Sequence, residues 1–375
     1  MRVIQSFDRE KENAETFDQV NEEARHIWIR ALRPNSLFWP VLDLTGTIGT
    51  ILVYIFGVRF MQQSTLTLAN LLLLIWYLGK FWEPLNTLSN FYNSILTAAA
   101  SMERIFEIMD TESAVQDKAG ASPLPPINGQ VTFDHVCFGY NSEKTILNDV
   151  SFDIKPGMTV ALVGPTGAGK STVVNLISRF YDVTVGRVMI DGHDIRDVQL
   201  LSLHRQMSVM MQDSFIFSGT IMDNIRYGRL DATDDEVIRA AKTVYAHEFI
   251  MNLPNGYQTE VNERGSMLST GKRQLISFAR ALLNDSKILI LDEATSFIDT
   301  RTEMLIQKAI EVLLKGRTSF VIAHRLSTIR NADLIMVVND GNIIERGTHE
   351  ELTKIPGGHY RALCEAQYRF MTAAD

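Results

Sequence analysis

The sequence predicts an α-helical membrane hairpin followed by an α/β domain that contains a phosphate-binding loop. Two observations support this prediction. Long apolar runs with few charges lie between Leu37 and Trp82, and strand and helix patterns alternate after Gly129 around one glycine-rich motif. A chain of 375 residues is long enough to hold both parts.

Two apolar segments predict the membrane hairpin. Leu37–Phe60 carries one acid, Asp43, and has no other charge before Arg59. With a rise of about 1.5 Å per residue, this segment is long enough to cross a bilayer core of about 30 Å. The polar turn Met61–Ser64 separates it from a second and shorter apolar segment, Leu66–Trp82.

The residues in and around the hairpin are compatible with more than one position for Asp43 and with more than one environment for the two helices. Thr45, Thr47 and two nearby glycines suit contacts between membrane helices, and Asp43 can lie at the headgroups, inside the bundle or against a substrate. The helical pattern continues to residue 109, which would return the chain to the cytosolic side. The alternative is a buried helical hairpin in a soluble protein.

The N-terminal residues give no indication of a signal peptide. Residues 1–17 lack a basic region followed by an apolar core, and the helical pattern runs from Arg2 to Leu32. These residues are typical of the middle of an amphipathic helix. We therefore expect the chain to begin within a larger protein.

Composition and charge narrow the choice of partners. The formal net charge of −8 argues against a nucleic acid as the main partner, because phosphate backbones favour basic surfaces. The two cysteines, Cys137 and Cys364, match no metal or redox spacing. We interpret them as small apolar residues.

A segment rich in small residues and proline marks the domain boundary. Residues 110–130 include Pro123, Pro125 and Pro126, and they are predicted to be a linker. This divides the chain into a partial membrane domain, residues 1–109, and an α/β domain, residues 131–375.

The glycine-rich motif, Gly164 to Ser171, fits the pattern G-x-x-x-x-G-K-[ST]. It follows the apolar strand Thr159–Val163 and precedes the helical pattern Thr172–Phe180, which is the context that this motif requires. Backbone N–H groups of such a loop surround phosphate oxygens, and the helix N-terminus adds partial positive charge. Lys170 would reach the β- and γ-phosphates, and Ser171 would offer its hydroxyl to Mg²⁺.

A second motif supplies two carboxylates. Four apolar residues, Ile288 to Leu291, precede Asp292 and Glu293, as expected for a buried parallel strand that ends at a ligand-binding edge. We predict that Asp292 holds Mg²⁺ and that Glu293 is the general base that polarises the attacking water. With the phosphate loop, these acids predict a nucleotide-hydrolysing enzyme.

Further elements make this part of the chain resemble the ATPase domain of an ABC transporter, because they occur in that family's order. Tyr140 matches the aromatic residue that stacks on adenine, and Gln212 matches the glutamine that senses Mg²⁺ and the γ-phosphate. Leu268–Lys272 stands at the position of the family's signature helix. Asp299 matches the loop that crosses the dimer interface, and His324 matches the switch histidine.

The resemblance implies an ABC-type fold, with an antiparallel β-subdomain and a helical signature subdomain. It also implies ATP and Mg²⁺ as ligands. The catalytic residues that it assigns are Gln212, Glu293 and His324, and the Mg²⁺ ligands are Ser171, Gln212 and Asp292. The nucleotide-binding residues that it assigns are Tyr140, Gly164, Thr166, Gly167, Gly169, Lys170, Ser171 and Thr172.

The signature departs from the family's usual LSGGQ. In the family's dimer this segment reaches the γ-phosphate of the other subunit's ATP, and Ser269 and the backbone of Gly271 keep that capacity. Thr270 places a β-branched side chain where close approach is wanted. Lys272 replaces a neutral amide with a cation, which could pair with phosphate. Phe297 is also bulkier than the family's usual residue.

A membrane hairpin fused directly ahead of the ATPase domain resembles the exporter class. The resemblance implies a coupling helix within Asp8–Phe17 that docks on the partner subunit's ATPase domain, and it makes the two spans the fifth and sixth of six. It further implies a multi-pass protein of the cell membrane with its ATPase domain in the cytoplasm.

The altered signature beside an intact phosphate loop resembles one subunit of a heterodimeric drug or lipid exporter. The alternatives are a homodimer with slow ATPase and a peptide exporter. Two readings come from other classes. A soluble ABC ATPase would lack the hairpin, and a regulatory subunit without turnover would be expected to lack Glu293 or His324.

Overall fold

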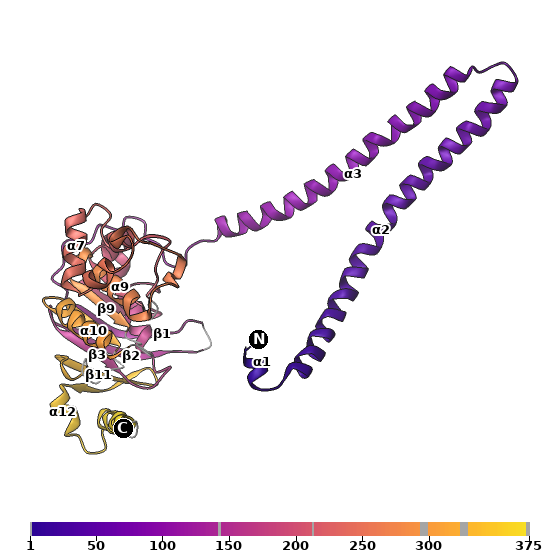
Figure 1. Ribbon diagram of the computed structural model, residues 1–375. Helices are drawn as coiled ribbons and strands as arrows, with labels where there is room; N and C mark the ends of the chain where they lie inside the picture. The colour runs from indigo at the N-terminus through magenta and orange to yellow at the C-terminus, as the bar shows by residue number, and fades with distance from the viewer. Residues whose placement is uncertain (1, 142–143, 212–213, 293–298, 323–328, 373–375) are drawn as a thin grey trace. The chain divides into compact units, whose positions relative to one another are not determined.

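The computed structural model describes residues 2–141, 144–211, 214–292, 299–322 and 329–372 (Figure 1). It divides into two compact units, residues 1–112 and 113–375. Unit 1 is entirely helical, and unit 2 combines sheets and helices.

Unit 1 consists of a short helix and two long ones. Its helices are α1 (Arg2–Ser6), α2 (Glu10–Gln62) and α3 (Leu68–Asp110). The predicted helix Arg2–Leu32 and the predicted first span are therefore largely one continuous helix, interrupted only by a turn near Asp8, where φ is +51°. That turn and the start of α2 occupy the predicted coupling-helix region.

The turn of the hairpin lies slightly later than predicted. Met61 and Gln62 still belong to α2, and α3 begins after Thr67, whose hydroxyl accepts a hydrogen bond from the Asn70 amide. Among the described residues, Pro40–Gln62 is the one helical segment long and apolar enough to cross a membrane, and Leu68–Phe81 is a shorter apolar segment. The predicted second span therefore has weaker support than the first.

Close contact between α2 and α3 depends on small residues. A Cβ atom added to Gly57 would lie 2.3 Å from the Leu71 side chain, which is buried. Thr45 and Thr47 instead donate to carbonyls of their own helix. Asp43 lines a groove between the two helices.

The described part of unit 2 forms three sheets. The antiparallel sheet has the order β2-β1-β4-β5, and its strands are β1 (Val131–Phe138), β2 (Leu147–Ile154), β4 (Val185–Ile190) and β5 (His193–Asp194). The six-stranded sheet has the order β12-β11-β3-β10-β9-β6. Its strands are β3 (Thr159–Val163), β6 (Met207–Met210), β9 (Ile288–Asp292), β10 (Thr318–Ile322), β11 (Leu334–Asn339) and β12 (Asn342–Gly347). The third sheet is the pair β7 (Gly219–Thr220) and β8 (Glu260–Val261).

The described helices of unit 2 contribute to the apolar cores on both sides of the six-stranded sheet, and all but the last two lie between two of its strands in the sequence. They are α4 (Lys170–Ile177), α5 (Leu200–His204), α6 (Ile221–Arg226), α7 (Asp234–Thr243), α8 (His247–Met251), α9 (Thr270–Asn284), α10 (Thr300–Leu314), α12 (His349–Thr353) and α13 (His359–Thr372). Single 3₁₀ turns occur at Ile195–Asp197, Gly256–Gln258 and Glu263–Gly265.

Two apolar cores share the strands of the six-stranded sheet. Along β9, Ile288 and Ile290 contribute to the core that contains the antiparallel sheet and α4. The alternate residues, Leu289 and Leu291, contribute to the core that contains α6 to α10. This alternation follows from the two faces of a β-strand. The four-residue apolar run of β9 is explained by burial on both faces.

Most of the predicted linker packs against unit 2. Leu124 and Ile127 are each 5% exposed and belong to the core that contains the antiparallel sheet. The Ile127 amide donates to the Gln206 side chain, and the Gln130 amide donates to Asp191. Proline explains the lack of regular structure here, but the apolar residues between the prolines hold the segment in place.

Candidate nucleotide-binding site

The candidate site lies at one edge of the six-stranded sheet. Strands β3, β10, β9 and β6 are parallel neighbours, so their carboxyl ends share that edge. Ile322 of β10 pairs with Leu162 on one side and with Asp292 on the other. The register therefore brings the phosphate loop, which follows β3, to the same edge as Asp292, as the sequence predicted.

The phosphate loop depends on glycine for its backbone conformation. Gly164, Gly167 and Gly169 have φ values of +144°, +83° and +109°. A Cβ atom at Gly164 would lie only 2.0 Å from the carbonyl oxygen of Val338, whereas nothing lies within 4 Å of a Cβ atom at Gly167. The loop ends at the N-terminus of α4, where unpaired amides and the helix dipole favour an anion.

Lys170 is the first residue of α4, and its side chain is buried. Its Nζ donates to the carbonyl oxygens of Gly164, at 2.9 Å, and of Pro165, at 2.8 Å. Burial lowers the pKa of Lys170, and the nearby Asp292 carboxylate opposes that shift. A phosphate bound in the loop would supply further negative charge to this cation.

Ser171 and Asp292 fit a magnesium site. Ser171 is exposed at the start of α4, and Asp292 is partly buried at the end of β9. Mg²⁺ uses oxygen ligands and keeps waters and substrate phosphates, so one or two protein ligands are enough. The described residues hold no cluster of three or more metal-binding side chains, which is the pattern of an all-protein cage.

Tyr140 is held beside the phosphate-loop helix. Its hydroxyl lies 3.2 Å from the Thr172 hydroxyl, and it accepts a hydrogen bond from Asn175 at 3.3 Å. Its ring packs edge-on against Phe138 and Tyr181, with 5.0 Å between the centroids in both pairs. The ring remains half exposed, as a platform for a base requires.

Replacing Tyr140 with Ala should raise the KM for ATP by about tenfold, because aromatic stacking on a base contributes about 1–3 kcal/mol. Because the predicted stacking involves the base and not the reacting phosphate, kcat should change little. Tyr140→Phe is the matched control, because it keeps the ring and loses only the hydroxyl bonds to Thr172 and Asn175. Steady-state ATP hydrolysis measures both constants, and equal KM values for the Ala and Phe variants would contradict the stacking role.

The signature segment begins helix α9. Ser269 is its N-cap residue, exposed and without a side-chain capping bond, and Gly271 is buried. The Lys272 ammonium lies 5.7 Å from the centre of the Phe249 ring on α8, which is a cation–π contact. The possible phosphate pairing of Lys272 therefore competes with a partner inside the same subunit.

Arg273 is a residue that sequence reasoning did not identify. Its guanidinium donates to the Leu268 carbonyl, at 2.7 Å, and to the Thr270 hydroxyl, at 3.2 Å. It thereby fixes the first turn of the signature helix. No local pattern marked it, because one arginine within a helical stretch is ordinary.

Asp299 caps helix α10. Its carboxylate accepts a hydrogen bond from the Thr302 amide at 2.9 Å, and this bond lowers the pKa of Asp299. The side chain is exposed. A capping role therefore accounts for Asp299 within the subunit, and its role at a dimer interface stays a prediction.

Three predicted catalytic residues, Gln212, Glu293 and His324, lie outside the described residues, and so does Phe297. Their assignments stay predictions. The strands that precede them in the chain, β6, β9 and β10, all end at the edge that carries the phosphate loop.

Two family models match the chain. The model described as ABC transporter matches residues 147–296, and the model described as ABC transporter transmembrane region matches residues 1–85. The two matches fall in the two units of the structure.

Similar proteins support the same family. An uncharacterised ABC transporter ATP-binding protein, YknV, of Bacillus subtilis (strain 168) is 50% identical over 98% of this chain and 61% of its own length. An ATP-dependent lipid A-core flippase of Syntrophus aciditrophicus (strain SB) is 42% identical over 96% of this chain and 60% of its own length. The chain thus spans about three fifths of the length of these relatives.

The structure of a bacterial Atm1-family ABC exporter with ATP bound gives a TM-score of 0.78. It is 36% identical in sequence, and the match covers 98% of this chain and 64% of that one. The phosphate loop, the paired domain matches and these similarities agree. The chain belongs to the ABC transporter family, and it carries that family's ATPase domain together with part of its transmembrane region.

Proposed function

We propose that this chain is the C-terminal part of one subunit of an ATP-driven exporter of the cell membrane. The observation that carries the proposal is that one chain joins a helix of membrane-spanning length to a complete phosphate-binding loop. ATP binding closes a dimer of ATPase domains, and hydrolysis reopens it. The ATPase domain lies in the cytoplasm.

The residues of this chain have distinct roles in that cycle. The phosphate loop and Lys170 bind the phosphates, Tyr140 supports the adenine ring, and Glu293 activates water. Ser171, Asp292 and Gln212 would hold Mg²⁺, which when bound neutralises charge on the phosphates. His324 contacts the γ-phosphate. Ser269 to Lys272 act on the ATP of the partner subunit.

A groove on unit 2 suits the docking of a coupling helix from the partner subunit. The groove, of about 660 Å³, is lined by β6, by the end of α5 and by residues of α9. Its exposed apolar side chains include Leu201, Met211 and Leu230, and Arg280 also faces it. An amphipathic helix end could place its apolar side on these residues.

We further propose that the exporter is a heterodimer. This chain's ATP would be hydrolysed against the normal signature of a second half-transporter, while the partner's ATP meets the altered signature here. The Lys272–Phe249 contact supports this arrangement, because it holds the Lys272 ammonium against an aromatic ring of the same subunit. The ammonium is then less available to bind phosphate in place of the glutamine that usually ends the signature. A homodimer with two slow sites is the competing arrangement.

We propose that the exported substrate is a drug or a lipid, and peptides are the alternative. Relatives bear the names of a lipid A-core flippase, a fatty acid transporter and a putative multidrug export protein. The groove between α2 and α3 carries Asp43 beside Thr47 and Thr50. A substrate contact for Asp43 remains one of the three positions open to it.

The test is Mg²⁺-dependent ATP hydrolysis by the full-length protein, purified alone and then with a co-encoded half-transporter. We expect negligible turnover alone and robust turnover together, and the latter should be lost with Glu293→Gln. Robust turnover by a purified homodimer would reject the heterodimer. Absence of nucleotide-dependent transport in every combination would reject export itself.

Restoring the signature should change the heterodimer's rate in a defined way. Thr270→Gly combined with Lys272→Gln should raise kcat for ATP by about twofold, because two competent sites replace one. Lys242→Gln, an exposed lysine on α7, is the control for loss of a positive charge. An unchanged kcat, measured in the complex, would show that the signature is not the cause of the asymmetry.

A further inference from the structure

Arg179 is a buried cation directly after the phosphate-loop helix. Its side chain is 1% exposed, although arginine is seldom fully buried without partners. Its φ is +51°, in the left-handed region that is uncommon for residues other than glycine. Helix α4 ends at Ile177, so Arg179 stands at the end opposite to Lys170.

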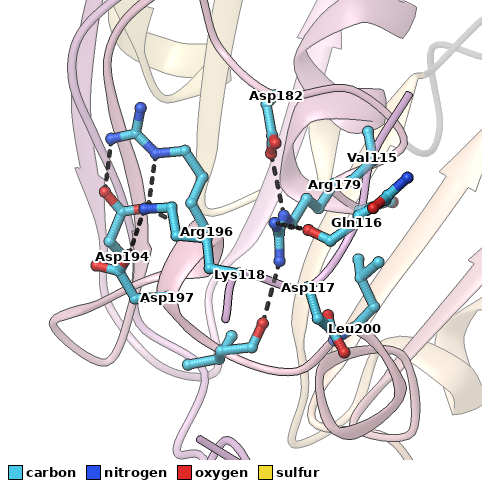
Figure 2. A network of polar contacts seen from close by, with 12 residues as sticks. Val115, Gln116, Asp117, Lys118, Arg179, Asp182, Asp194, Arg196, Asp197 and Leu200 are labelled. Atoms are coloured by element: carbon cyan, nitrogen blue, oxygen red, sulfur yellow. Dashed lines mark hydrogen bonds and ion pairs between the residues drawn. The ribbon is translucent and has the colours of Figure 1, made fainter. Parts of the chain in front are cut away.

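The guanidinium of Arg179 joins its own turn to two segments that are distant in sequence (Figure 2). Its Nε donates to Asp182 at 3.0 Å, and its Nη1 donates to the Val198 carbonyl at 3.0 Å. Its Nη2 donates to the carbonyl of Gln116, also at 3.0 Å. Gln116 lies in the segment that follows helix α3, only six residues after Asp110.

Residues 115–118, here called the strap, are also bound to the segment that leads into α5. The Asp117 carboxylate accepts a hydrogen bond from the Leu200 amide at 2.8 Å, and Lys118 pairs with Asp197 at 2.5 Å. Figure 2 shows these residues around Arg179. The same α5 contacts the end of α4 independently, since His204 Nε2 lies 2.8 Å from the Ser178 carbonyl oxygen.

The chain itself and these hydrogen bonds together connect the end of α3 to the phosphate-loop helix within one subunit. The chain leaves α3, enters the strap after four residues, and is tied through Arg179 to the end of α4. The first residues of α4 belong to the phosphate loop. Helix α5 in turn leads through Arg205 and Gln206 into β6, and Gln212 follows β6 in the sequence.

We propose that Arg179 is a positioning residue that couples the exit of the membrane helix to the phosphate loop of the same subunit. It acts through α4 and touches neither ATP nor Mg²⁺. The inference rests on the proposed function, because coupling has meaning only if ATP drives the membrane helices. This route is additional to the coupling helix, which acts on the partner subunit.

An arginine suits this task better than a lysine. Its planar fork presents donors in fixed directions, and here they reach a carboxylate and two carbonyls at once. A lysine would keep the charge and fill much of the space, but it could not hold all three acceptors. Arg179→Lys therefore separates coupling from the mere presence of a buried cation.

The experiment is hydrogen–deuterium exchange on the full-length transporter in lipid nanodiscs, in a Glu293→Gln background, with and without Mg-ATP. The Leu200 amide reports on the strap, because it donates to Asp117, and the Gln199 amide reports on the segment directly after the strap, because it donates to Ser122. In the parent, we expect ATP to slow exchange both in the phosphate loop and at these two amides. In Arg179→Lys, ATP should still protect the loop, while its effect at the two amides should fall by about tenfold, the loss expected for one charge-assisted hydrogen bond.

Two further variants keep the test decisive. Arg187→Lys is the matched control, because Arg187 is an exposed arginine paired with Asp134, and it should behave like the parent. Asp117→Ala with Lys118→Ala loosens the exposed strap without disturbing the buried cation, so it remains informative if Arg179→Lys folds poorly. Because Asp117→Ala removes the acceptor of the Leu200 amide itself, this double variant is followed at Gln199 alone, whose acceptor on Ser122 is unchanged. The ATP effect at Gln199 should be lost.

The outcomes separate this inference from the proposed function. An undiminished ATP effect at the two amides in Arg179→Lys, or at Gln199 in the strap double variant, would overturn the coupling role. Loop protection without any effect at these amides in the parent would also overturn it. Failure of ATP to protect the phosphate loop in the parent would instead contradict the nucleotide-binding function on which the inference rests.

Discussion

Replacing Lys170 with Met should lower kcat/KM for ATP hydrolysis by about 10²- to 10³-fold, which is the usual cost of removing a preorganised charge at a reacting phosphate. The ammonium already lies against the carbonyls of Gly164 and Pro165, so it is positioned before the substrate arrives. Met has a similar shape and tolerates burial, so the fold should be retained.

The control for this substitution is Lys155→Met, an exposed lysine in the turn before β3. Its kinetics should match the unmodified protein. The measurement is steady-state hydrolysis of Mg-ATP, with binding of a fluorescent nucleotide recorded in parallel. A Lys170→Met variant with kcat/KM near that of the control would show that another cation neutralises the phosphates.

The second large effect is expected at Gly164. Gly164→Ala should destabilise the ATPase domain by about 3 kcal/mol, because a strained φ and a backbone clash combine there. The added Cβ atom would lie 2.0 Å from the Val338 carbonyl oxygen on β11, and that backbone is held by its pairing with β3 and β12. Neither β11, which carries Val338, nor β3, which precedes Gly164, can move without disrupting the pairing of the sheet.

Gly167→Ala is the matched control within the same loop. Gly167 also has a positive φ, of +83°, but nothing lies within 4 Å of its added Cβ atom. Its cost should therefore be limited to the left-handed conformation, about 1–2 kcal/mol. The decrease in the melting temperature of the full-length protein should be larger for Gly164→Ala than for Gly167→Ala. Equal shifts would mean that the loop moves away from Val338 and that the contact does not matter.

The local motifs were the features that sequence reasoning predicted well. The phosphate loop, the strand before Asp292 and the start of the signature helix each depend on a few consecutive residues with fixed chemistry. Their convergence at one sheet edge follows from the parallel order of the strands. That convergence could be anticipated from alternating strands and helices.

Long-range contacts were not predictable in the same way. The docking of residues 113–130 depends on two buried apolar residues in a proline-rich segment and on partners about 60 to 80 residues away. Composition alone could not distinguish this segment from a free linker. Similarly, the contact between Lys272 and Phe249 joins two helices with no shared pattern.

The shared strand β9 has a consequence for how the ATPase domain unfolds. Ile288 and Ile290 pack in one core, and Leu289 and Leu291 pack in the other. Unfolding of either core would therefore displace β9 and remove packed side chains from the other core. The two layers should therefore melt in one cooperative transition. A nucleotide bound at the edge where β9 ends would then raise the melting temperature of the whole domain. It would also reduce local unfolding in both cores, on the two faces of the six-stranded sheet.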